Sequence, residues 1–179
     1  MKAIDSIPKL IKYNASSYTI HLSTFDTWLN DELDHGLDVE PDFQRLHVWS
    51  RAQQISFIEY MLKGGIQQPL YFNCPEHPTA NMDYVLVDGR NRLISVKLFL
   101  DNQLPAFGAT LNEYDKPDVL KRSNGIVVSI NTLKTKAEVL QWYIEINATG
   151  TPHTEQELTK AKDLLDKELS EVYCKNFTY

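Results

Sequence analysis

The chain has 179 residues, a net charge of −6 and a hydrophobic share of 42%, which is the composition of a globular domain. The acidic balance argues against a general nucleic-acid coat, because binding along phosphate backbones draws on many lysines and arginines. No apolar run approaches the roughly 20 residues that cross a bilayer. The N-terminus is too polar for a secretory signal, and the 2 cysteines are too few for a disulfide framework. We expect one domain over residues 1–179 in the reduced cytoplasm, without membrane contact.

The N-terminal part of the chain predicts a strand followed by a helix. Residues 17–22 alternate as in a strand, and Ser23 or Thr24 is placed to cap the helix FDTWLNDEL. Gly36 predicts the end of this helix. Residues 38–50 then predict extended or loop structure.

The next part predicts a capped helix and two strands. Ser50 precedes the helix RAQQISFIEYML, whose apolar side chains share one face, and Gly64–Gly65 stop it. Residues 68–73 predict a strand, and residues 74–83 a polar loop. Residues 84–87 are apolar throughout, as in a strand that is buried on both faces.

The remaining elements complete a mixed architecture. A helix is expected from residue 90 to about residue 103, and residues 104–124 receive no assignment. Residues 125–133 predict a buried strand, and Thr135 caps the helix KAEVLQWYIEIN. A capping-box pattern opens an amphipathic C-terminal helix over about residues 154–170. The predicted class is α+β, a small mixed sheet surrounded by helices.

The segment Asp88-Gly89-Arg90-Asn91-Arg92 lies where a strand turns into a helix. Arginines are poorly placed there, because the positive end of the helix dipole repels them. An anion at the helix start would remove this conflict by pairing with the guanidinium groups and the backbone amides. Asp88 is suited to hold a divalent metal or to orient a nucleophilic water. The alternative is a surface cluster of ion pairs.

A second polar segment, DFQRLHVW, covers residues 42–49. Gln44 and Arg45 stand between Phe43 and Trp49, so they offer polar groups on an aromatic wall that suits a base and a phosphate. The alternative is a strand with both aromatic rings in the core. His47 is two residues from Arg45, where it would serve as a general base or simply be exposed or packed.

A third segment, NATGTP, covers residues 147–152. Asn147, Thr149 and Gly150 can turn amides and hydroxyls toward a ligand, although a helix C-cap followed by an N-cap also explains them. The histidines lack zinc-binding spacing, and the chain has no Walker lysine loop, no G-x-S-x-G elbow and no G-x-G-x-x-G. Nucleotide chemistry here would need a different architecture.

The order of these segments resembles the DUF262 family, the N-terminal domain of GmrSD-type modification-dependent restriction enzymes in the ParB/sulfiredoxin superfamily. The resemblance covers roughly residues 18–165. The usual signature D-G-Q-Q-R-L has Arg90 and Asn91 here in place of its glutamines. The late signature N-x-x-G-x-x-L appears as NATGTPH, with His153 at the usual leucine.

The resemblance implies a ParB/sulfiredoxin-like fold that binds a nucleoside triphosphate at the D-G-x-x-R segment and hydrolyses it with a metal such as Mg²⁺. Catalytic roles then fall to Asp88, Arg92 and His47, with Asp88 as the metal ligand. The remaining residues are expected to bind the nucleotide: Gln44, Arg45, Trp49, Gly89, Arg90, Asn91, Asn147, Thr149 and Gly150. We expect Gln44, Arg45, Asp88, Arg92 and Asn147 to line one pocket, with Phe43 or Trp49 stacking on the base.

Three functions remain open at this stage. The first is a nucleoside-triphosphate phosphohydrolase linked to DNA modification, restriction or conflict between phage and host. The second is a phosphotransferase acting on a modified base in DNA or on a small acceptor, with Asp88 or His47 activating its hydroxyl. The third is a non-catalytic module that binds nucleotide, modified DNA or a defence protein. Because the sequence stops at Tyr179, we expect either a small protein of a mobile element or phage, or a subunit that works with a separate nuclease or defence protein.

Overall fold

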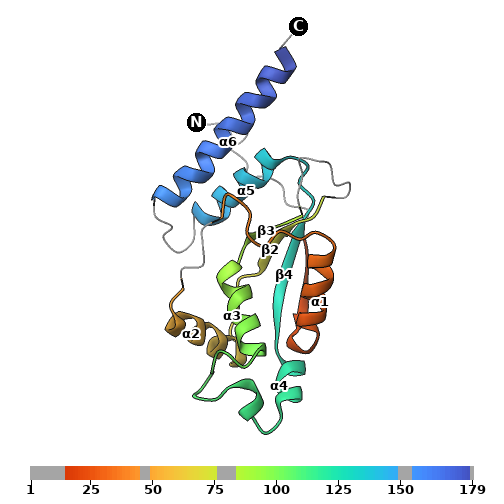
Figure 1. Cartoon of the computed structure of the whole chain (residues 1–179), viewed down its shortest axis with the longest axis vertical. Coiled ribbons are helices and arrows are strands. Elements are labelled where there is room, and N and C mark those ends of the chain that lie inside the picture. The colour runs from red at the N-terminus through yellow and green to blue at the C-terminus, as the bar shows by residue number, and fades with distance from the viewer. Residues whose placement is uncertain (1–14, 45–48, 76–83, 149–154, 178–179) are drawn as a thin grey trace, which may run out of the picture.

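The computed structural model describes residues 15–44, 49–75, 84–148 and 155–177 (Figure 1). Within these residues lie four strands, six α-helices and one 3₁₀ turn. The strands are β1 (Ser16–His21), β2 (Leu70–Asn73), β3 (Val85–Asp88) and β4 (Gly125–Asn131). The helices are α1 (Leu22–Asp34), α2 (Arg51–Leu62), α3 (Arg90–Leu100), α4 (Pro117–Ser123), α5 (Lys136–Ala148) and α6 (Glu155–Phe177), and the 3₁₀ turn is η2 (Leu111–Glu113).

The strands form one mixed sheet in the order β1-β4-β2-β3. The central strands β2 and β4 run parallel, with Leu70 opposite Val128. Each edge strand is antiparallel to its neighbour: β1 to β4 and β3 to β2. The predicted α+β class with a mixed sheet is therefore confirmed.

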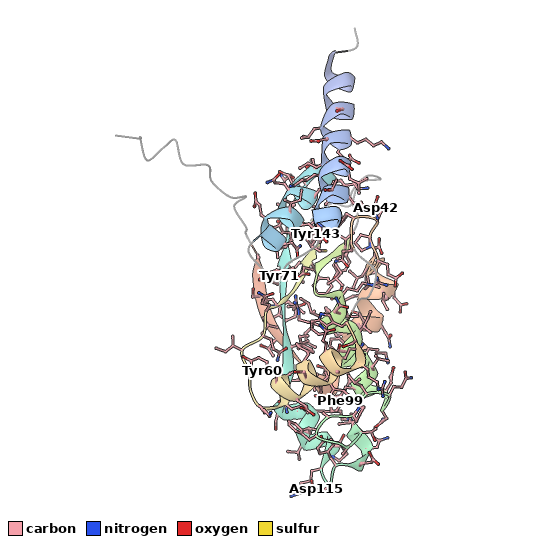
Figure 2. The ribbon with its side chains drawn as sticks, turned by 90° about the vertical axis from the view of Figure 1, so that its left-hand side faces the viewer. Asp42, Tyr60, Tyr71, Phe99, Asp115 and Tyr143 are labelled. Atoms are coloured by element: carbon pink, nitrogen blue, oxygen red, sulfur yellow. The ribbon has the colours of Figure 1, made fainter. Side chains whose placement is uncertain are left out.

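Helices cover both faces of the sheet and bury two hydrophobic clusters. Leu86 of β3 joins the first cluster, which packs against α1, α2 and α3 and contains Phe99. Val85 and Val87 point to the other face and join the second cluster, which contains Tyr143 of α5. Figure 2 shows Tyr143 toward the end formed by α5 and α6, and Phe99 toward the α4 end. Each large side chain buried in these clusters stabilises the fold by about 1.5–3 kcal/mol.

Several predicted helix boundaries are confirmed. Ser50 caps α2 in a capping box in which its Oγ accepts from the backbone N–H of Gln53. Thr135 caps α5 in the same way with Glu138. Gly36 and Gly64 follow α1 and α2 with φ of +90° and +79°, the left-handed conformation that ends a helix without strain only at glycine.

Other predicted boundaries are wrong. Helix α1 begins at Leu22 with His21 as its N-cap, so neither Ser23 nor Thr24 caps it. Leu22 is buried, and its N–H donates to the carbonyl of Asn124, so packing and pairing fix the helix start ahead of both hydroxyl residues. Helix α4 falls in the unassigned stretch, although Pro117 at its start is a typical signal.

Helix α6 extends to Phe177, beyond the predicted end near residue 170. It packs on α5 through the fully buried Ala161 and then continues past α5 (Figure 1). In the part of the chain that the structure describes, neither α6 nor any other helix has the length and apolar character needed to cross a membrane.

Candidate functional site at the junction of β3 and α3

Strand β3 passes into α3 through a single residue, Gly89, which lies at the N-cap of α3 with φ of +109°. L side chains rarely adopt this conformation. A Cβ atom here would also lie 2.6 Å from Leu70 Cδ2 and 3.0 Å from Arg92 Nη2. Glycine is therefore required twice, for the turn and for the close approach of the turn to β2.

Arg92 ties the first turn of α3 to both neighbouring segments. Its Nη2 donates to Asp88 Oδ2 at 2.8 Å and to the carbonyl oxygen of Pro69 at 3.0 Å. The two charged side chains are mostly buried, with 13% of Arg92 and 23% of Asp88 exposed. Within the described residues, the buried Nε of Arg92 has no hydrogen-bond acceptor. Arg92 thus braces the junction and still carries one unused donor.

Arg90 forms a second ion pair, with Glu40. The Arg90 side chain is only 13% exposed, whereas that of Glu40 is 65% exposed. The two residues are 50 positions apart, and no spacing rule relates them. The sequence analysis therefore missed Glu40 as a member of this cluster. The one available signal was Pro41, which keeps the backbone of Glu40 out of a helix.

Residues 38–44 run along the outer edge of β3. Asp38 forms an isolated bridge with Val85. Farther along, Gln44 Nε2 donates to the carbonyl oxygen of Leu86 at 2.6 Å. The N–H of Trp49 donates to Asn91 Oδ1 at 3.3 Å. The structure therefore brings Gln44 and Trp49 beside the segment that contains Asp88. Gln44 Oε1 is buried and lacks a partner among the described residues.

The two aromatic residues of this segment have different surroundings. Phe43 is buried against Tyr143, with ring centroids 5.3 Å apart. Phe43 is thus a core residue, and the expectation that it stacks on a base is wrong. Trp49 is half-buried and packs against Phe57 of α2, with centroids 5.6 Å apart.

Asn147 lies on α5, and its hydrogen bond is made within that helix. Its Nδ2 donates to the carbonyl oxygen of Tyr143, one turn earlier in the same helix. In the described part of the chain, no hydrogen bond joins Asn147 to Asp88 or Arg92. The other predicted site residues, Arg45, His47, Thr149 and Gly150, lie outside the described residues, as does Thr154 of the predicted capping box.

The donor set at the junction suits one kind of metal site. Among the described residues, no group of three or more His, Cys, Asp or Glu side chains is arranged to hold a metal ion. A cage made by the protein alone therefore does not fit here. Mg²⁺, however, commonly takes one or two carboxylates and completes its shell with water and substrate phosphates. Asp88 is the carboxylate at the junction that could take part in this second arrangement.

A second polar cluster lies at the side of the sheet covered by α1. Tyr84 Oη donates to Glu32 Oε2 at 2.8 Å. Burial and this hydrogen bond raise the pKa of Tyr84, and burial raises the pKa of the Cys74 thiol. Both groups are therefore protonated near neutral pH, and neither is activated as a nucleophile.

The comparisons with known proteins identify the family. The family model of the GmrSD restriction endonuclease N-terminal domain matches residues 25–125. These residues extend from α1 to the start of β4, so they include the polar segment before α2 and the whole β3–α3 junction. Asn147 lies beyond the match. No curated protein and no solved structure matched the chain. Because the matched residues make up more than half of the chain, the protein belongs to the family of GmrSD restriction endonuclease N-terminal domains, a family of restriction-related defence proteins.

Proposed function

We propose that this domain binds a nucleoside triphosphate at the β3–α3 junction and hydrolyses it as part of a restriction system. The observation that carries the proposal is the gathering of Asp88, Arg90 and Arg92 at the start of α3, inside the region that matches the restriction family. The helix dipole disfavours arginines at a helix N-terminus; Asp88 and Glu40 compensate part of this, and a bound phosphate would add to the compensation.

The backbone supports phosphate binding at this place. Leu93 is the first residue of α3 whose N–H reaches a carbonyl of the helix start, that of Gly89. The N-terminal end of the helix dipole and the Arg92 Nε would together favour a phosphate here, and Trp49 stands at the side where a base would stack.

Asp88 is the residue that would hold Mg²⁺, which would supply charge neutralisation on the phosphates. Arg92 already fixes the orientation of the Asp88 carboxylate, so binding a metal would cost little side-chain entropy. A positioned carboxylate of this kind is also suited to orient an attacking water. The chain's own part of the reaction is thus to hold the phosphates with Arg90 and Arg92 and to place one carboxylate beside them.

One observation favours a second candidate, a non-catalytic module that binds nucleotide or a partner of the restriction system. The Asp88 carboxylate is paired with Arg92 at 2.8 Å, and Arg92 in turn holds Pro69. The same pairing is expected if the Asp88 carboxylate only holds the junction together. The two candidates differ in whether removing the negative charge of Asp88 damages turnover or stability.

The test is to incubate the protein with each nucleoside triphosphate and Mg²⁺ and to measure released phosphate. Release supports hydrolysis, transfer of label to modified DNA supports a phosphotransferase, and binding without turnover supports the binding module. Asp88→Asn should keep the fold and lower turnover by at least about a hundredfold, the scale of a positioned acid–base group. The matched control is Asp42→Asn, which removes an exposed carboxylate paired with Lys136. If Asp88→Asn instead melts far below the parent, Asp88 is a structural partner of Arg92.

A further inference from the structure

The ion pair between Arg90 and Glu40 occupies a guanidinium group that the proposed site needs. Arg90 is the first residue of α3. Its side chain is mostly buried, and its partner Glu40 is mostly exposed. The charges at the junction therefore form two carboxylate–guanidinium pairs, Asp88–Arg92 and Glu40–Arg90. Any phosphate that binds Arg90 must compete with Glu40.

The two pairs differ in how firmly they are held. Asp88 and Arg92 are both mostly buried, and Arg92 is braced by the carbonyl of Pro69. Glu40, by contrast, reaches Arg90 from the solvent side. Water solvates the Glu40 carboxylate well once it leaves Arg90, so this pair separates at a lower cost than a pair of two mostly buried charges. Of the two pairs, the pair with Glu40 is the one that an incoming anion can exchange.

The position of Glu40 does not depend on its carboxylate. Its backbone N–H donates to Asp38 Oδ1 at 2.7 Å. Asp38 is itself fixed to β3, because its N–H donates to the carbonyl of Tyr84 and its carbonyl accepts from Leu86. Removing the charge of Glu40 should therefore leave the segment in place along β3, so that a variant reports on charge alone.

We propose that Glu40 is a further specificity-determining residue of the site: it occupies Arg90 in the free protein, a bound phosphate displaces it, and a divalent cation compensates the displaced carboxylate. This inference rests on the proposed function. When phosphate takes Arg90, the freed carboxylate lies next to the phosphate oxygens and repels them. A divalent cation near both groups removes that repulsion. Glu40 would thereby make the site favour a metal–nucleotide complex over the free nucleotide.

The experiment measures the affinity of the four nucleoside triphosphates by calorimetry, with Mg²⁺ and with the metal chelated. Without metal, Glu40→Gln should bind about fivefold more tightly than the parent, the effect of a partly exposed ion pair. With Mg²⁺ the gain should shrink or vanish. In an Arg90→Gln background, which removes the guanidinium group and keeps a polar side chain, Glu40→Gln should change nothing. Asp42→Asn is the control, since it removes an equal charge from the same segment (Figure 2).

The outcomes separate this inference from the proposed function. The inference is supported if Glu40→Gln raises the affinity for nucleotide, if this increase requires Arg90, and if it fades with Mg²⁺. It is also supported if, without metal, Glu40→Gln binds nucleotide and the parent does not. The inference is overturned if Glu40→Gln binds no more tightly than the parent, if Asp42→Asn gains as much, or if the gain persists without Arg90. In those cases nucleotide binding by the parent still stands. Absence of binding in the parent and in every variant, with or without metal, overturns both.

Discussion

Gly89 shows at the scale of one residue how the backbone and the site constrain each other. The turn from β3 into α3 needs a positive φ, and the same residue must leave room for Leu70 and Arg92. A side chain here would push apart the groups that hold Asp88 in place. The glycine of the D-G-x-x-R pattern is therefore explained by packing as well as by conformation.

Gly89→Ala should destabilise the protein more than Gly64→Ala does. Both substitutions place alanine at a positive φ, which costs about 1–2 kcal/mol. Gly64 has open space around its Cβ position, whereas Gly89 meets Leu70 and Arg92. The clash should add at least about 1 kcal/mol, measured as the difference between the two variants in urea denaturation. Equal losses would mean that the junction relaxes freely around a methyl group.

Arg92→Ala should weaken both nucleotide binding and folding. The affinity should fall by about ten- to a hundredfold, because a charge-assisted hydrogen bond of roughly 1.5–3 kcal/mol is lost. The free energy of unfolding should fall by about 1–3 kcal/mol, because Asp88 and the carbonyl of Pro69 lose their partner. Calorimetry and thermal melting measure the two effects separately. An unchanged affinity with a lowered melting temperature would make Arg92 a purely structural brace.

At the scale of elements, the N-cap of α2 fixes both a helix start and one end of the polar segment. Ser50 forms the capping box, and the preceding Trp49 donates to Asn91 on α3. The same few residues therefore begin α2 and attach it to the start of α3. Trp49 therefore has a defined place beside α3, although the sequence around it predicts a loop.

Ser50→Ala should destabilise the protein by about 1 kcal/mol, the usual cost of losing an N-cap oxygen. For a chain of this size, that corresponds to a fall of roughly 2–4 °C in the melting temperature. The control is Ser123→Ala at the exposed end of α4, where no cap is removed. If the two variants melt together, the capping box contributes nothing in solution.

At the scale of the whole molecule, the sheet separates two hydrophobic clusters, and only the second is packed against α6. Among the residues whose burial the structure describes, the first cluster, under α1, α2 and α3, contains none from α6. The second cluster depends on α5 and α6, which meet at Ala161. The two faces of β3 belong to different clusters, so the site lies where the layers join.

Ala161→Glu should loosen α5 and α6 while α1 and α3 stay folded. A charge buried between the two helices costs about 3 kcal/mol, and local opening relieves it. Hydrogen exchange should show lost protection in α5 and α6 only. Lys162→Glu introduces the same side chain at the neighbouring exposed position and should leave protection unchanged. Loss of protection throughout the chain would show that the two layers unfold as one unit.

The sequence by itself determined the local features of this protein. Caps and glycines marked the helix boundaries at Ser50, Thr135, Gly36 and Gly64, and apolar runs marked the central strands, because these signals act within one or two turns of chain. It also carried the order of motifs that the family match supports over residues 25–125.

Only the tertiary structure decided which distant charges meet. Ion pairs depend on where the segments fold, and no local pattern relates Glu40 to Arg90 or the carbonyl of Pro69 to Arg92. For the same reason Phe43, ambiguous in the sequence, proved to be a core residue, and the start of α1 followed the burial of Leu22. Burial and pairing between remote segments outweigh local propensity, because the free energy of packing exceeds that of a single cap.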